Sequence, residues 1–127
     1  MPDQLLLSVE DLHVRYGSVE VLKGISLKVR SGEVVALIGA NGAGKSTALM
    51  AISGILPVSK GNIRFSGREI RSLPSEGRVS LGITQVPEGR RLFPRMTVTE
   101  NLLIGGTLRM DRTGIEKDLA WVLKLFP

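Results

Sequence analysis

The stretch that decides the fold reads VVALIGANGAGKSTALMAI and covers residues 34–52. It begins with an apolar run at residues 34–38, continues through a glycine-rich segment at residues 39–44, and ends in residues 45–52, which contain no glycine or proline. A short apolar run bounded by glycine is consistent with a buried strand. We therefore expect a buried strand, a glycine loop and a helix, in that order.

The glycine loop has the spacing of a phosphate-binding loop, Gly39-x-x-x-x-Gly44-Lys45-Ser46. Glycines let backbone N–H groups approach an anion closely, and the N-terminus of the next helix adds its positive dipole end. A glycine-rich turn that binds nothing is the alternative. In the binding interpretation Lys45 reaches the β- and γ-phosphates and Ser46 binds Mg²⁺. The residues expected at the nucleotide are Gly39, Asn41, Gly42, Ala43, Gly44, Lys45, Ser46 and Thr47.

Composition places the chain among ordinary globular proteins. Its 127 residues are 43% hydrophobic and 23% charged, which suits one modest domain. The chain has no cysteine, so disulfides and thiolate chemistry are excluded. No apolar run approaches the roughly 18 residues that span a bilayer, and no secretory signal is evident. A cytosolic protein is the expectation.

The net charge of +5 is concentrated in one segment. Residues 60–95 contain eight basic and three acidic residues, and the remainder of the chain is balanced. A solvated basic face, a nucleic-acid surface, and a surface for membrane headgroups or an acidic partner are all compatible with this charge. Only Phe65 and Phe93 are aromatic in this segment, which disfavours stacking on single strands.

Strand patterns dominate the beginning of the chain. Residues 5–10, 12–16 and 19–29 are strand-like, the last broken near Gly24, and a shorter strand is expected over 61–67. These segments predict an antiparallel β layer. A further short strand is expected over 82–86. His13 has no evident partner, and packing or surface exposure is favoured over catalysis for it.

Helix signals follow. Gly54 and Pro57 should stop the helix after Lys45, and residues 74–79 should form a short helix. A capping box at Thr97–Glu100 predicts a helix start near Val98, and Thr113–Glu116 is a second capping box. Trp121 is expected to belong to a packing face.

Residues that precede the loop resemble the start of an ABC-transporter ATPase subunit. The matching segments are RYG at 15–17, VLKGISL at 21–27 and GEVVALIG at 32–39. The resemblance implies that Tyr16 stacks on adenine. It also implies that Gln85 contacts Mg²⁺ together with Ser46 and positions the attacking water, so Lys45 and Gln85 would be the catalytic residues.

Residues 85–102, QVPEGRRLFPRMTVTENL, are similar to ATP-binding subunits of branched-chain amino acid importers and their relatives for amides and urea. The resemblance covers essentially the whole chain. It implies ATP and Mg²⁺ as cofactors, membrane-spanning permease subunits bound through the loop Gln85–Arg95, and a second ATPase subunit, identical or different. It implies no nucleic acid, and a peripheral location on the inner face of the cell membrane.

The expected fold class is α/β, a RecA-like P-loop core portion with an N-terminal antiparallel β layer and the start of a helical subdomain. The signature LSGGQ and an apolar strand ending in Asp-Glu are absent from the 127 residues. We therefore expect an incomplete ABC ATPase domain with exposed apolar surface and little or no ATP turnover. The boundaries expected are 1–31 and 60–70 for the β layer, 32–59 and 71–96 for the core, and 97–127 for the helical part.

Three alternatives remain open at this point. The chain could belong to an ABC ATPase that acts on nucleic acid or the ribosome. It could be a kinase or GTPase of another P-loop class. As it stands, it could also be only a nucleotide-binding or interaction fragment.

Overall fold

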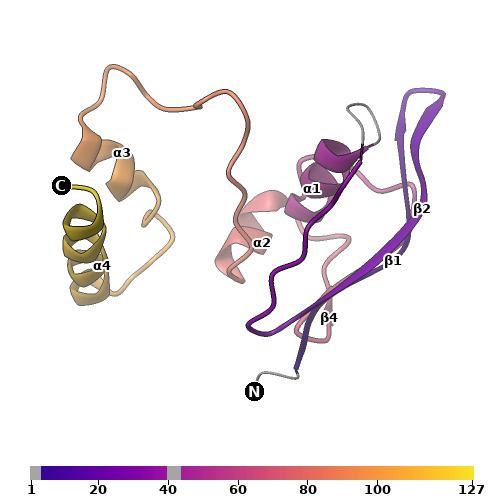
Figure 1. Ribbon diagram of the computed structural model, residues 1–127, viewed down its shortest axis with the longest axis horizontal. Helices are drawn as coiled ribbons and strands as arrows, with labels where there is room; N and C mark the ends of the chain where they lie inside the picture. The colour runs from indigo at the N-terminus through magenta and orange to yellow at the C-terminus, as the bar shows by residue number, and fades with distance from the viewer. Residues whose placement is uncertain (1–3, 40–43) are drawn as a thin grey trace. The chain divides into compact units, whose positions relative to one another are not determined.

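The computed structural model describes residues 4–39 and 44–127 and divides the chain into two compact units (Figure 1). The first unit ends at Gln85 and the second covers Val86–Pro127.

An antiparallel sheet forms the larger part of the first unit. Its strands lie in the order β2-β1-β3-β4, and each neighbouring pair is antiparallel. The predicted antiparallel β layer is therefore confirmed. The strands are β1 (Leu5–Tyr16), β2 (Val19–Arg30), β3 (Lys60–Phe65) and β4 (Arg68–Glu69).

A bulge in β1 joins the two strand patterns seen in the sequence. Asp11 has φ 49°, and the pairing of β1 with β3 shifts between Glu10 and His13. Strict alternation after Val9 would point residues 11 and 13 into the core. Because of the extra residue in the bulge, Leu12 and Val14 are buried there instead. Since a one-residue slip turns every later side chain over, the bulge keeps both apolar patterns on the core face.

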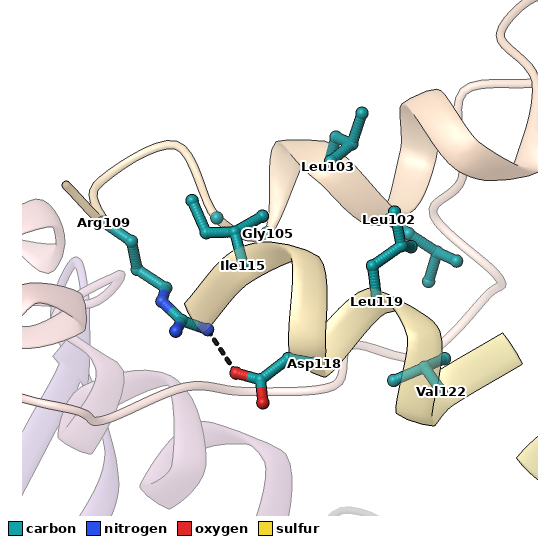
Figure 2. A pocket seen from close by; sticks show the side chains of 9 residues that line it. Leu102, Leu103, Gly105, Arg109, Ile115, Asp118, Leu119 and Val122 are labelled. Carbon is teal, nitrogen blue, oxygen red and sulfur yellow. Dashed lines mark hydrogen bonds and ion pairs between the residues drawn. The ribbon is translucent and has the colours of Figure 1, made fainter. Parts of the chain in front are cut away.

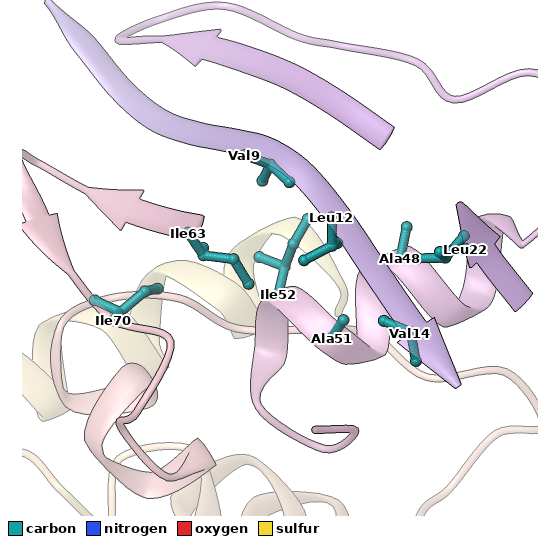
Figure 3. Packing of buried hydrophobic residues seen from close by; sticks show 9 residues of the cluster. All are labelled: Val9, Leu12, Val14, Leu22, Ala48, Ala51, Ile52, Ile63 and Ile70. Atoms are coloured by element: carbon teal, nitrogen blue, oxygen red, sulfur yellow. The ribbon is translucent and has the colours of Figure 1, made fainter. Parts of the chain in front are cut away.

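Helix α1 (Lys45–Ser53) packs against the sheet and completes the core (Figure 3). It ends at Gly54, with φ 84°, which confirms the predicted stop. The predicted short helix is also confirmed as α2 (Ser75–Ser80). The buried apolar cluster consists of Val9, Leu12, Val14, Leu22, Ala48, Ala51, Ile52, Ile63 and Ile70.

Two predicted strands do not form. Residues 34–38 and 82–86 have no strand structure, and the exposed fractions of Val34 and Ile38 are 96% and 95%. The prediction of a buried strand at residues 34–38 was therefore wrong for this structure. A strand needs a neighbour to satisfy its N–H and C=O groups. In the described part of the chain, the sheet pairs only β1 to β4.

The second unit consists of two helices, α3 (Val98–Ile104) and α4 (Arg112–Leu125). The capping box predicted at Thr97 and Glu100 is confirmed, with both of its hydrogen bonds present. The second predicted box was wrong. Helix α4 begins one residue before Thr113 and its N-cap is Asp111, so Thr113 lies inside the first turn.

A small hollow lies between α3 and α4 (Figure 2). Ile115, Leu119 and Val122 of α4 line it, and an ion pair between Arg109 and Asp118 lies at its polar end. Its volume of about 140 Å³ is below the roughly 300–1,000 Å³ of ordinary ligand pockets. We therefore treat it as a packing feature.

Candidate nucleotide-binding site

The start of α1 is built around Gly44. This residue is the N-cap, its φ of 94° is left-handed, and its carbonyl accepts the first helical hydrogen bond from Ala48 N at 2.8 Å. A Cβ added at Gly44 would lie 2.5 Å from Leu22 Cδ2 on β2. Conformation and packing therefore both require glycine here, and they fix the N-terminal end of α1 against the β layer.

Lys45 spans the glycine loop. Its ammonium group donates a hydrogen bond to the carbonyl oxygen of Gly39, six residues earlier. A lysine in this position presents its charge at the helix N-terminus, where anions are already favoured. Next along α1, Ser46 is exposed and Thr47 is buried. Three further residues predicted to hold phosphates lie outside the described part of the chain: Asn41, Gly42 and Ala43.

Tyr16 lies at the end of β1, next to the β1–β2 turn, with 44% of its surface exposed. The pairing of β1 with β2 shows how far Tyr16 lies from the start of α1. Leu22, which contacts Gly44, pairs with Val14, two residues before Tyr16. Tyr16 therefore lies two residues along β1, at about 3.3 Å per residue, from the strand position beside the start of α1, and part of its surface is exposed.

The side-chain oxygen of Gln85 is a candidate ligand atom of the site. Its Oε1 atom is buried and has no hydrogen-bond partner among the described residues. A buried acceptor without a partner costs roughly 1–3 kcal/mol, so such groups call for an explanation. An amide oxygen is also a suitable ligand for Mg²⁺ or a water molecule. The donor chemistry of Gln85 and Ser46 therefore fits the predicted metal role.

A hollow of about 210 Å³ lies beside Lys45, lined by Ile25, Leu37, Ile38, Gly44, Lys45 and Ala48. Its lining is mostly apolar, and the ammonium of Lys45 is its single charged group. The volume is smaller than that of a typical ligand pocket. This hollow brings the predicted site residues Gly44 and Lys45 together with apolar side chains.

Sequence reasoning missed Arg78. Arg78 belongs to the basic segment at residues 60–95, for which a solvated face is one interpretation. Only 3% of its surface is exposed. Its guanidinium donates to the carbonyls of Ala51 and Ile52, which end α1. Burial lowers the pKa of Arg78, and attraction to Glu69 opposes that shift. No local sequence signal reveals this role, because the acceptors lie 26 and 27 residues away in the chain.

The expectation that His13 lacks a partner was also wrong. Its Nδ1 lies 2.6 Å from Glu20 Oε1, and its Nε2 lies 3.0 Å from Asp11 Oδ1. These two hydrogen bonds, the one to Glu20 first, raise the pKa of His13, and the hydrogen bond to His13 lowers the pKa of each carboxyl. His13 is therefore part of a surface charge cluster on the β layer, which agrees with a packing or surface role.

Comparison with known families gives the class of protein. The chain matches the ABC transporter family over residues 22–126. It belongs to that family, and the resemblance inferred from the sequence is confirmed. A kinase or GTPase of another P-loop class is therefore excluded.

Individual relatives narrow the comparison. The chain is 44% identical over 122 residues to the high-affinity branched-chain amino acid transport ATP-binding protein BraG of Pseudomonas aeruginosa, covering 96% of this chain and 52% of the relative. It is 38% identical over 108 residues to the lipopolysaccharide export system ATP-binding protein LptB of Haemophilus influenzae, covering 85% and 45%. The chain thus spans about half the length of the curated relatives it matches.

A solved structure titled as the ATP-binding subunit of an ABC transporter has the same fold. Its TM-score is 0.77 at 33% identity, covering 88% of this chain and 46% of the other. The predicted fold class is confirmed. Among the described residues, the helices are too short or too polar to cross a membrane.

Proposed function

We propose that this chain is part of the ATP-binding subunit of an ABC importer for branched-chain amino acids or related small polar substrates. The observation that carries the nucleotide-binding part of the proposal is the start of α1, where Gly44 is held against β2 and the Lys45 ammonium reaches the Gly39 carbonyl. That arrangement puts a positive charge and a helix N-terminus at one point, which suits a triphosphate.

The remaining site residues have complementary roles in the proposal. Tyr16 offers an aromatic face to adenine, and Gln85 offers its unpartnered oxygen to the metal or the attacking water. Bound Mg²⁺ would neutralise phosphate charge. Ser46 and Gln85 would hold it, because hydroxyl and amide oxygens are hard ligands suited to this cation. Lys45 would stabilise negative charge on the transferred phosphoryl group.

The loop Gln85–Arg95 is proposed as the contact with the membrane-spanning subunits. Val86, Leu92 and Phe93 are exposed there, and Leu92 and Phe93 lie between Arg91 and Arg95. Asn101 fixes the backbone of Phe93 at both ends, accepting from its N–H at 2.9 Å and donating to its carbonyl at 3.1 Å. A fixed loop that exposes apolar and basic groups suits a protein partner. Its use would place the protein at the inner face of the membrane.

Nucleotide binding is tested by titrating the chain with ATP and Mg²⁺ and comparing wild type with Lys45→Ala. We expect affinity to fall roughly ten- to hundredfold, because a charge-assisted contact to phosphate is lost. The matched control is Lys28→Ala, an exposed lysine on β2, which should bind as the wild type does. Unchanged affinity in Lys45→Ala would remove the assigned site.

Partner choice is tested by co-purification from membranes. Phe93→Asp should lose the membrane subunits while it retains ATP binding, and Val19→Asp, an exposed apolar residue on the β1–β2 hairpin, should keep them. Competition between leucine and urea in transport assays would then separate the substrate classes. Co-purification with nucleic acid or ribosomes would instead support a non-transport ABC ATPase.

ATP hydrolysis by the chain is tested separately from ATP binding. We expect the 127-residue chain to release phosphate no faster than background, because it carries Lys45 and Gln85 but neither a signature sequence nor a carboxylate for the water. A phosphate-release assay with measurable turnover would contradict this part of the proposal.

A further inference from the structure

Arg78 makes an unusual set of contacts. Its Nη1 donates to Ala51 O at 2.8 Å and Ile52 O at 2.9 Å. Its Nη2 donates to Arg71 O at 2.9 Å, and its Nε to Leu73 O at 3.0 Å. One buried guanidinium thus joins the end of α1 to the turn that leads into α2.

Glu69 attracts this charge, but among the described residues the hydrogen-bond acceptors of the guanidinium are backbone carbonyls. Two of them belong to the last turn of α1, where the helix dipole is negative. The planar fork of arginine can address several acceptors at once, whereas lysine concentrates its donors on one atom. The contacts therefore select arginine specifically.

The backbone of Arg78 continues the connection toward Gln85. The Arg78 carbonyl accepts hydrogen bonds from Leu81 N and Ile83 N, each at 3.1 Å. Ile83 is two residues before Gln85, and α1 begins at Lys45. A nine-residue helix is a rigid rod about 13 Å long. Side chain and backbone of Arg78 thus connect the helix that carries the phosphate-binding lysine to the segment that carries the glutamine.

Gly54 closes the same junction. It has φ 84°, and an added Cβ would lie 2.9 Å from Arg78 Nε and 3.1 Å from Ser75 N. Only glycine leaves room for the guanidinium beside the end of α1. The hydrogen bonds of the guanidinium and the lack of room for a side chain at Gly54 both show that this junction is closely packed.

We propose that Arg78 is a positioning residue that couples the phosphate-binding start of α1 to Gln85. When nucleotide fixes α1, the guanidinium transmits that restraint to residues 82–85. The coupling rests on the proposed function, but the junction itself is testable without nucleotide.

The first experiment is amide hydrogen exchange on the full chain without ligand, comparing wild type with Arg78→Lys. We expect exchange on the order of ten- to hundredfold faster at Gly54, Ile55 and Ile83, because charge-assisted bonds at both sides of the junction are lost. Amides of β1 and β3 should be unchanged. Arg68→Lys, an exposed arginine on β4, is the matched control and should leave the junction unchanged.

The second experiment repeats the measurement with ATP and Mg²⁺. In the wild type both the start of α1 and residues 82–85 should gain protection. In Arg78→Lys the start of α1 should still gain protection, while residues 82–85 should not. A residue that only stabilises the fold would not separate the two segments.

The outcomes are distinguishable. If Arg78→Lys still protects residues 82–85 with nucleotide, or if exchange without ligand rises equally over β1 and β3, the coupling role is wrong. If the wild type shows no protection at α1, the proposed nucleotide function is wrong, and the ligand-free comparison still decides the junction. Gly54→Ala, which crowds Arg78 without changing its charge, should reproduce the ligand-free pattern of Arg78→Lys.

Discussion

Strand β1 and residues 34–38 are both apolar, strand-like segments, and they have opposite outcomes. Leu12 in β1 is completely buried, while Val34 and Ile38 are almost fully exposed. Strand β1 has β2 on one side and β3 on the other, and both neighbours are antiparallel, although β3 comes from more than 40 residues further along the chain. Residues 34–38 have no paired neighbour in the described residues. Pairing partners, not hydrophobicity, therefore decide which segment becomes a strand.

The difference in burial between Leu12 and Ile38 predicts a large difference in what each side chain contributes to stability. Leu12→Ala should lower the free energy of unfolding by about 2–5 kcal/mol, because it removes buried contacts and leaves a cavity. Ile38→Ala should change it by less than about 0.5 kcal/mol, because its side chain is exposed. Urea unfolding of the full chain measures both. An equally large loss in Ile38→Ala would mean that residues 34–38 are packed as a strand in solution.

The bulge that keeps β1 in phase can be tested at Gly61. Its φ is 104°, and an added Cβ would lie 2.2 Å from Asp11 O and 2.6 Å from Glu10 O. Gly61→Ala should cost about 3 kcal/mol of unfolding free energy through strain and overpacking. The control is Gly67→Ala, which has φ 80° and no close neighbour, and should cost about 1 kcal/mol. Equal losses would show that the bulge does not constrain Gly61.

The second unit offers a smaller contrast between its two helix starts. Thr97→Ala should destabilise α3 by about 1 kcal/mol, because the threonine hydroxyl accepts from Glu100 N. Thr113→Ala should change α4 by less than about 0.5 kcal/mol, because Thr113 is not a cap. Hydrogen exchange of the two helices reports each effect separately. Faster exchange of α4 in Thr113→Ala would restore the capping box predicted there.

Local patterns predicted what local interactions decide. The hairpin, the start of α1 at the glycine loop, its end at Gly54, and the Thr97 box all depend on residues a few positions apart. The failures depend on distant partners. Residues 34–38 need a neighbouring strand, and Arg78 needs carbonyls from α1. The site roles of Tyr16 and Gln85 remain predictions, because they depend on a bound nucleotide.

The same lesson applies to His13, which the sequence left without a partner. The β1–β2 pairing brings Glu20 to it, and the bulge brings Asp11. Lys60 also contacts Asp11 at 3.5 Å, and Lys23 on β2 pairs with His13 in register. The partners of His13 therefore arise from register and bulge geometry, neither of which a single-sequence pattern specifies.

The contribution of this cluster to folding stability should depend weakly on pH. Glu20 and Asp11 raise the pKa of His13 above its ordinary value near 6.5, so the charged imidazole stabilises the folded state. That contribution is complete below about pH 6.5 and fades as pH rises through the folded-state pKa. The lowered pKa values of Glu20 and Asp11 act in the opposite sense, so their contribution is present above their ordinary values near pH 4 and is lost as pH falls below them.

His13→Gln isolates the histidine part of that dependence, because glutamine can hydrogen-bond but does not titrate. Between pH 5.5 and pH 8.5 the urea midpoint of the wild type should fall relative to that of the variant, because the histidine contribution is lost as pH rises. The difference should be modest, since both carboxylates are partly exposed to solvent and screened. Parallel midpoints in both proteins would mean that His13 keeps the same protonation equilibrium in the folded and unfolded chains. Asp11 and Glu20 would then contact His13 without stabilising its charged form in the folded chain.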